Sequence, residues 1–168
     1  MDRRSFVQGA ASIPLTLGAA ASAEPSQFDP YANFLDLIRA WQRHDIDAVL
    51  AKLADDIVWY ARVGAPPVIG KAIVREAMLK LAPTRKVENW RIHYHAVNGD
   101  RLFVEGVDDY TGHDGRRVAV PYAGVIEHRD RLIAGWRDYF DIGTLDRMKA
   151  GEPIPEAIAP LVARKGEP

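Results

Sequence analysis

Cysteine is absent from all 168 residues of the chain, and this absence removes a whole group of sites. Without a thiol there can be no disulfide framework, thiolate zinc site, iron–sulfur cluster or cysteine nucleophile. An excess of charge of one sign is also lacking, since 22 Lys and Arg stand against 23 Asp and Glu. A formal net charge of −1 provides no basic field for a phosphate backbone, so we expect no nucleic-acid partner.

Motifs for nucleotide, serine and metal chemistry are missing as well. No glycine-rich loop follows a strand-like run, which argues against a nucleotide cofactor. No Gly-x-Ser-x-Gly element is present to supply a serine nucleophile. His93 and His95 lie two apart in a strand-like run, but no third metal ligand is evident near them. We therefore expect neither a metal nor a cofactor in a chain whose 48% apolar content is that of an ordinary globular protein.

The N-terminal segment resembles a twin-arginine export signal. Arg3 and Arg4 precede a weakly apolar stretch, and Ala21-Ser22-Ala23 provides a small-x-small cleavage site. The alternative is a membrane anchor, but the stretch is too short and too rich in Gly, Ala and Ser to span a hydrocarbon core of about 30 Å. We predict a signal peptide over residues 1–23, a linker over 24–29, and a periplasmic mature protein without a stable membrane span.

Helical spacing dominates the first half of the mature chain, and a period of two dominates the second. Apolar residues at helical spacing predict helices over 31–43 and 71–81, with a short helix capped by Asp45 between them. A β-branched and aromatic run predicts a strand over 57–60. Alternation and turn residues then predict strands over 87–97, 101–111, 116–128 and 131–140, followed by a short helix over 143–148.

This order of elements predicts an α+β domain over residues 30–150, with a C-terminal tail over 151–168. Consecutive hairpins produce a mainly antiparallel sheet, which must curve strongly if it is to wrap around the helices. We expect a cone-shaped barrel with the N-terminal helices packed over the concave face of the sheet. Such a cone encloses an apolar hollow, which is a common site for a small ligand.

Strand alternation assigns side chains to this hollow. On the last strand Trp136, Asp138 and Phe140 share a face, which places the Asp138 carboxyl group among aromatic rings. A carboxyl group in such surroundings is either paired or has a raised pKa, and both arrangements are typical of acid–base catalysis. We also predict a substrate-binding set made of Trp59, Val104, Val120, Tyr122, Trp136 and Phe140.

Three segments resemble the limonene epoxide hydrolase family, in the SnoaL-like branch of the nuclear-transport-factor-two-like superfamily. The most specific is Gly135-Trp136-Arg137-Asp138-Tyr139-Phe140-Asp141. Two weaker matches precede it in the expected order, namely Trp59-Tyr60 with Pro66-Pro67 and Gly70, and Glu105-Gly106-Val107-Asp108. Together the matches span residues 30–148.

The resemblance implies a cofactor-free epoxide hydrolase in which Asp138 activates water and Asp108 protonates the epoxide oxygen. It also implies that Tyr60 helps to hold the water and that the protein is a homodimer. Two positions depart from the family, which has an arginine where this chain has Gly106 and an asparagine where it has Arg62. Because Tyr60 and Arg62 are two residues apart, we hypothesise that Arg62 occupies the vacated space and bridges Asp108 and Asp138.

Two other functions stay open at this point. The same pocket suits a cofactor-independent lyase, isomerase or dehydratase, with Arg62 stabilising an oxyanion. A non-catalytic periplasmic binder of an apolar ligand would keep the aromatic lining but would not need paired acids. In each case we expect the ligand to be a small hydrophobic molecule, terpenoid or aromatic, because of the predicted lining.

Overall fold

The computed structural model describes residues 28–168, so the predicted signal peptide and most of the linker lie outside the described part. None of the helices in this part is long and apolar enough to cross a membrane. The chain forms, in order, α1 (Pro30–Gln42), α2 (Ile46–Leu50), β1 (Leu53–Tyr60), β2 (Val68–Ile69), α3 (Lys71–Leu81), η1 (Ala82–Thr84), β3 (Arg85–Glu88), β4 (Arg91–Asn98), β5 (Arg101–Gly112), β6 (Arg117–Arg129), β7 (Leu132–Tyr139), α4 (Ile142–Lys149), η2 (Glu156–Ile158) and α5 (Ala159–Val162).

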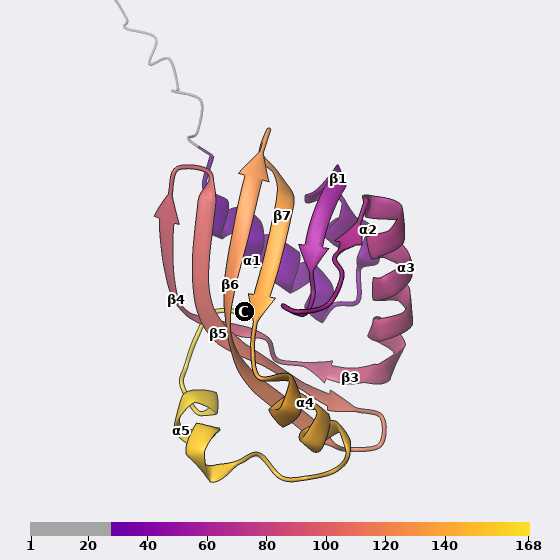
Figure 1. Cartoon of the computed structure of the whole chain (residues 1–168), viewed down its shortest axis with the longest axis vertical. Coiled ribbons are helices and arrows are strands. Elements are labelled where there is room, and N and C mark those ends of the chain that lie inside the picture. The colour runs from indigo at the N-terminus through magenta and orange to yellow at the C-terminus, as the bar shows by residue number, and fades with distance from the viewer. Residues whose placement is uncertain (1–27) are drawn as a thin grey trace, which may run out of the picture.

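The first helix forms where the local signals place it. The Asp29 carboxylate accepts hydrogen bonds from the backbone N–H groups of Tyr31 and Ala32, so it caps the start of α1. Phe34, Ile38 and the other apolar residues at helical spacing are fully or almost fully buried. This buried face packs α1 against the sheet, and Figure 1 shows α1 crossing behind the strands.

Seven strands form one curved sheet in the order β2-β1-β7-β6-β5-β3, with β4 also paired to β5. All pairings are antiparallel except that of β1 with β7, which is parallel. The sheet therefore curls around α1, while α3 stands beside β1 and α4 lies near one end of the strands (Figure 1). The predicted α+β cone with helices over a strongly curved, mainly antiparallel sheet is confirmed.

The predicted strand over 87–97 is wrong in one respect, because two strands occupy this stretch. β3 pairs with the second half of β5, and β4 pairs with the first half. The strand is interrupted at Asn89 and Trp90, which lie between β3 and β4. At this point the Asn89 N–H donates to the Asp109 carbonyl at 2.7 Å. The break allows one edge of the sheet to follow the strong curvature of β5.

The C-terminal tail packs on the outer face of the sheet. Val162 is buried against Val107 and Ala119, which point away from the concave side. Glu167 then forms an isolated antiparallel bridge with Ile92 through two backbone hydrogen bonds. The concave side of the sheet, with α1, α3 and α4, is left to form the cavity.

Candidate functional site

A cavity of about 190 Å³ lies on the concave side of the sheet. Its aromatic lining comes from α1, β1, β5, β6, β7 and the segments beside β4 and α4, and consists of Trp41, Trp59, Trp90, Tyr110, Tyr122, Trp136 and Phe140. Its charged lining residues are Arg62, Arg85, Asp108, Asp138 and Lys149. An apolar hollow with a few convergent charged groups is the usual form of a small-molecule site.

Asp138 on β7 is held by two indole groups. Trp136 Nε1 donates to Asp138 Oδ1 at 2.8 Å, and Trp59 Nε1 donates to Oδ2 at 3.4 Å. Burial, with a smaller effect from the charge of Asp108, raises the pKa of Asp138 to about 7, although the two indole donors oppose the rise. A carboxyl group with this pKa exchanges a proton readily near neutral pH, as a general base must.

Strand register creates the space that Asp138 occupies. Gly124 on β6 faces Asp138 across the ladder, and a Cβ at position 124 would lie 3.6 Å from Asp138 Oδ1 and 2.9 Å from Val104 Cγ2. The missing side chain therefore gives the carboxyl group a place beside the sheet.

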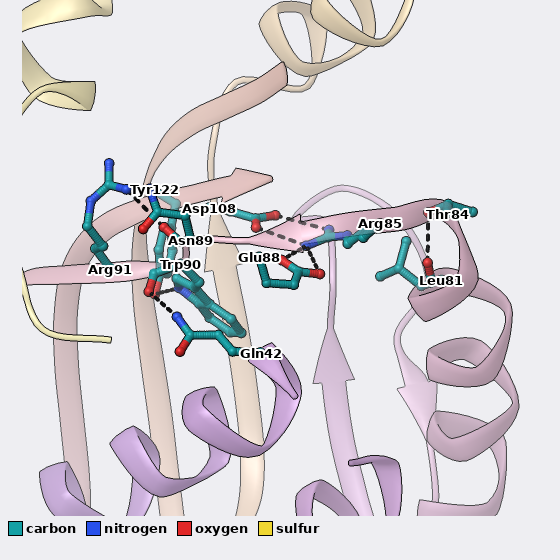
Figure 2. Close-up of polar contacts among 10 residues, drawn as sticks. All are labelled: Gln42, Leu81, Thr84, Arg85, Glu88, Asn89, Trp90, Arg91, Asp108 and Tyr122. Carbon is teal, nitrogen blue, oxygen red and sulfur yellow. Dashed lines mark hydrogen bonds and ion pairs between the residues drawn. The ribbon is translucent and has the colours of Figure 1, made fainter. Parts of the chain in front are cut away.

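Asp108 on β5 is paired with an arginine that comes from β3 (Figure 2). Arg85 Nη1 and Nη2 donate to the two Asp108 carboxylate oxygens at 3.0 and 3.2 Å. Nη1 also donates to the Glu88 carboxylate at 3.2 Å, so the guanidinium lies between two acids. The Asp108 side chain is 34% exposed, whereas that of Glu88 is fully buried, so Asp108 is the acid that faces the cavity.

Arg85 reaches this position because the end of α3 turns sharply into β3. Pro83 lies within η1, and the Thr84 hydroxyl donates to the Leu81 carbonyl at 2.7 Å, which closes the turn (Figure 2). The guanidinium lies 3.9 Å over the Tyr110 ring, where the aromatic face favours a cation.

The pKa of Glu88, behind Arg85, is raised to about 7 by burial, although the nearby guanidinium opposes this rise. Glu88 is not among the residues that line the cavity. We therefore assign it to the support of Arg85 rather than to contact with a ligand.

Tyr122 on β6 adds a neutral phenol to the cavity. Its hydroxyl oxygen accepts a hydrogen bond from Trp90 Nε1 at 2.6 Å (Figure 2). Burial raises the pKa of Tyr122 well above 10, and the charge of Asp138 raises it further. The phenol therefore keeps its proton, and among the described residues no acceptor takes it.

Most of the sequence-predicted residues come together in this cavity. Asp108, Asp138, Trp59, Val120, Tyr122, Trp136 and Phe140 all line it. Val104 does not, because it is buried in the apolar cluster behind the cavity, where it packs against Gly124.

Tyr60 was predicted to face the water, but Trp59 lines the cavity instead. The parallel register pairs Trp59 with Trp136 and Tyr60 with Arg137, so the Trp59 side chain points inward and that of Tyr60 points outward. An indole N–H therefore contacts Asp138 where the resemblance implied a phenol.

The hypothesis that Arg62 bridges Asp108 and Asp138 is wrong. β1 ends at Tyr60, so the alternation that placed Arg62 beside Tyr60 no longer applies. Arg62 is exposed at the cavity lining, and within residues 28–168 no hydrogen bond or ion pair joins it to either acid. Arg85 is the cation that contacts Asp108.

Sequence reasoning missed Arg85 because its signal is weak. Arg85 lies two residues before the expected strand over 87–97, and its spacing of three residues from Glu88 does not place the two on one face of a strand. The irregular register between Arg85 and Val87 turns both side chains inward. The need for a cation beside Asp108 was predictable, but its source was not.

Gly106 cannot hold the family's arginine in this fold. A Cβ at position 106 would lie 2.2 Å from the Arg91 carbonyl oxygen and 3.1 Å from the Tyr122 ring. The β4 and β5 backbones approach closely here because their register is irregular between Ile92 and Tyr94.

No group of three or more metal-ligating side chains occurs in the described part of the chain. Of the two histidines considered from the sequence, His93 Nδ1 lies 3.1 Å from the Lys165 carbonyl oxygen. His95 stacks on the Tyr31 ring with a centroid distance of 3.5 Å.

Comparison with known families decides where the chain belongs. The family model for the limonene-1,2-epoxide hydrolase catalytic domain matches residues 32–150. The chain belongs to the limonene-1,2-epoxide hydrolase family. A search of the curated proteins finds no match.

Solved structures place this family member among known cone folds. An LEH-like epoxide hydrolase from M. tuberculosis is 27% identical, with a TM-score of 0.64 over 74% of this chain and 91% of that chain. A proposed SnoaL-like polyketide cyclase from Shewanella putrefaciens is 14% identical, with a TM-score of 0.64 over 73% of this chain and 97% of that chain. The fold is that of the nuclear-transport-factor-two-like superfamily, and the second likeness shows the fold alone.

Proposed function

We propose that this protein hydrolyses an epoxide on a small, largely apolar substrate without a cofactor, with Asp138 as the water-activating base. The observation that carries the proposal is the Asp138 carboxyl group, held by Trp136 Nε1 and Trp59 Nε1 at the cavity wall. Family membership and the epoxide hydrolase from M. tuberculosis support the choice of reaction.

Each step uses side chains that line the cavity. Asp138 takes a proton from a water molecule, and the water oxygen attacks one epoxide carbon. The C–O bond at that carbon breaks, and its electron pair stays on the epoxide oxygen. Asp108 gives this oxygen a proton, and Arg85 stabilises the carboxylate that remains. The product is a vicinal diol, and exchange with solvent then removes the proton from Asp138 and returns one to Asp108.

The two indole groups give Asp138 its orientation. Each carboxylate oxygen accepts one N–H, which leaves lone pairs free for a water molecule in the cavity. The apolar surroundings keep the pKa of Asp138 near 7, so the group is a stronger base than an ordinary carboxylate.

The test is hydrolysis of terpene and aryl epoxides in water labelled with heavy oxygen, followed by mass spectrometry of the products. Incorporation of one labelled oxygen into a diol is expected for the wild-type protein and not for Asp138→Asn. Turnover to a product without the label would overturn the hydrolase proposal.

A second candidate is a cofactor-independent isomerase, dehydratase or lyase in the same cavity. It is favoured by Tyr122, whose phenol is neutral and accepts the Trp90 N–H, which strengthens its own O–H as a donor. Asp138 would remove a proton from the substrate. Tyr122 would stabilise the oxyanion and supply a proton to it, in place of Arg62. Turnover of hydroxylated aromatic substrates without the label is its expected sign.

A non-catalytic binder remains the third outcome. It would bind apolar ligands equally well in the wild-type protein and in Asp138→Asn, with no turnover by either. From Arg3 and Arg4 we also propose export to the periplasm, which cell fractionation of the wild-type chain and an Arg3→Lys/Arg4→Lys variant would test.

A further inference from the structure

The cavity has an apolar body but a cationic rim. Among its lining residues, which all belong to the described part of the chain, the two exposed ones are Arg62 and Lys149. Asp138, Tyr122 and Trp136 lie on the sheet side of the same cavity. The reacting groups and the two exposed cations are therefore contributed by different parts of the wall.

Neither rim cation is neutralised by the protein. Within residues 28–168, no carboxylate forms an ion pair with Arg62 or Lys149. The acids whose charges act on Lys149 are Asp146 and Asp108, and Asp108 is already held by Arg85. Asp146 lies one turn earlier on α4 and outside the cavity lining.

The two cations act on each other through the same space. Burial lowers the pKa of Lys149, and the charges of Arg62 and Arg85 lower it further. Like charges at such a rim disfavour each other, and an anion between them would relieve that repulsion.

A second hollow begins where the cavity ends at Lys149. It shares Leu81, Tyr110 and Lys149 with the first cavity and has a volume of about 530 Å³. Its acid, Asp114, is paired with Arg116 at 3.1 Å and so does not compensate Lys149. An anionic group at Lys149 would therefore have room and would meet no free carboxylate.

We propose that the substrate is an apolar acid, whose carboxylate is bound by Arg62 and Lys149 at the rim while its apolar body fills the cavity. For the reacting centre the inference rests on the proposed function, which places an epoxide beside Asp138. Arg62 is then a specificity residue that selects and orients the substrate, rather than a catalytic residue.

Binding of two matched probes tests the proposal without any turnover. Perillic acid and perillyl alcohol share one apolar skeleton and differ in a carboxylate against a neutral hydroxymethyl group. Tryptophan fluorescence reports binding, because Trp59, Trp90 and Trp136 line the cavity. At low salt we expect the acid to bind roughly tenfold more tightly than the alcohol, as two partly exposed ion pairs allow.

The control variants isolate the rim. In Arg62→Gln/Lys149→Gln the preference for the acid should fall below about twofold, with the affinity for the alcohol unchanged. Lys80→Gln removes an exposed cation of α3 that does not line the cavity, and it should keep the preference. Equal binding of both probes by the wild-type protein, no binding of either, or an unchanged preference in the double variant would each overturn the proposal.

The outcome is separate from that of the proposed function. If the acid is preferred but no epoxide takes up labelled oxygen, the anion site stands and the hydrolase proposal fails. If epoxides are hydrolysed but the acid is not preferred, the hydrolase proposal stands and the anion site fails.

Discussion

At the scale of single residues, the site is defined by how two acids are held differently. Asp138 receives only neutral N–H donors, from Trp136 and Trp59, whereas Asp108 receives the guanidinium of Arg85. An indole donor supplies a hydrogen bond without a full charge, so burial still dominates the pKa of Asp138. Two carboxyl groups in one cavity thus acquire different tasks from their partners.

The raised pKa of Asp138 predicts how stability depends on pH. The pKa of Asp138 is about 7 in the folded protein and 3.8 in the unfolded chain. Asp138 therefore does not lower the free energy of unfolding below pH 4, but it lowers that free energy progressively as the pH rises from 4 to 7. Asp138→Asn cannot ionise and should raise the free energy of unfolding at pH 8 by up to about 4 kcal/mol. This gain in stability should shrink towards pH 4. The same Asp138→Asn substitution should also lower the turnover number by about 100-fold or more.

Thermal unfolding of both proteins between pH 4 and pH 8 measures this effect. Glu76→Gln is the matched control, since Glu76 is an exposed acid on α3 and should show no such gain. A stability difference that stays constant across this pH range would contradict the assigned pKa shift.

Arg85 is predicted to have a structural and a functional effect that can be separated. Arg85→Met leaves Glu88 buried without its cation, which should cost about 3–5 kcal/mol of stability. The double variant Arg85→Met/Glu88→Gln removes the buried charge and should recover most of that loss. The turnover number of this double variant should stay low, because Asp108 still lacks the Arg85 guanidinium.

Denaturant unfolding and steady-state kinetics on the two variants distinguish these effects. Activity that returns together with stability in the double variant would show that Arg85 has no role in positioning Asp108.

At the scale of elements, irregular strand register decides which side chain carries each role. Between Ile92 and Tyr94 the pairing of β4 with β5 shifts, which brings the Arg91 carbonyl over Gly106. Tyr94 therefore lies on the opposite side from Ile92, although the two are two residues apart, and it is 62% exposed. The closed space over Gly106 also means that the arginine for Asp108 must come from another strand.

Substitution of Gly106 should therefore be poorly tolerated. A Cβ there would overlap the Arg91 carbonyl oxygen, so Gly106→Ala should cost at least about 1–3 kcal/mol of stability. Gly143→Ala is the control, because in α4 the added Cβ meets neighbours at 3.4 Å or more and alanine favours a helix. Equal effects of the two substitutions on chemical denaturation would refute the steric explanation.

At the scale of the whole molecule, the sheet separates a reactive inner face from an outer face that is partly open. The C-terminal segment covers the outer face near Val107 and Ala119. On the uncovered remainder of this face, Phe103 and Tyr139 are each about 40% exposed. Large exposed aromatic residues on a sheet face are typical of a protein interface.

This outer face underlies the prediction that the protein is a homodimer. Sedimentation velocity should give twice the mass of the mature chain at micromolar concentration. Phe103→Asp should shift the protein to monomer, whereas Ile73→Asp, on the exposed side of α3, should not. A monomeric wild-type protein would disprove the prediction.

Local signals were sufficient for most elements. The predicted helix over 71–81 coincides with α3, because Gly70 precedes it and Pro83 closes it. Tyr122, Trp136 and Asp138 were placed in the cavity by alternation within regular parts of strands, and Asp108 was placed there by the family motif. These inferences depend only on residues that are close in sequence.

The sequence by itself determined the α+β cone, the family and the pair of acids, because periodicity, turn residues and a specific motif are local properties. Tertiary structure alone decided that Trp59 replaces Tyr60 beside Asp138, that Arg85 replaces Arg62 beside Asp108, and that Arg62 is exposed at the cavity lining. Each of these outcomes depends on a register shift or a strand end, where the period of two no longer tells which way a side chain points.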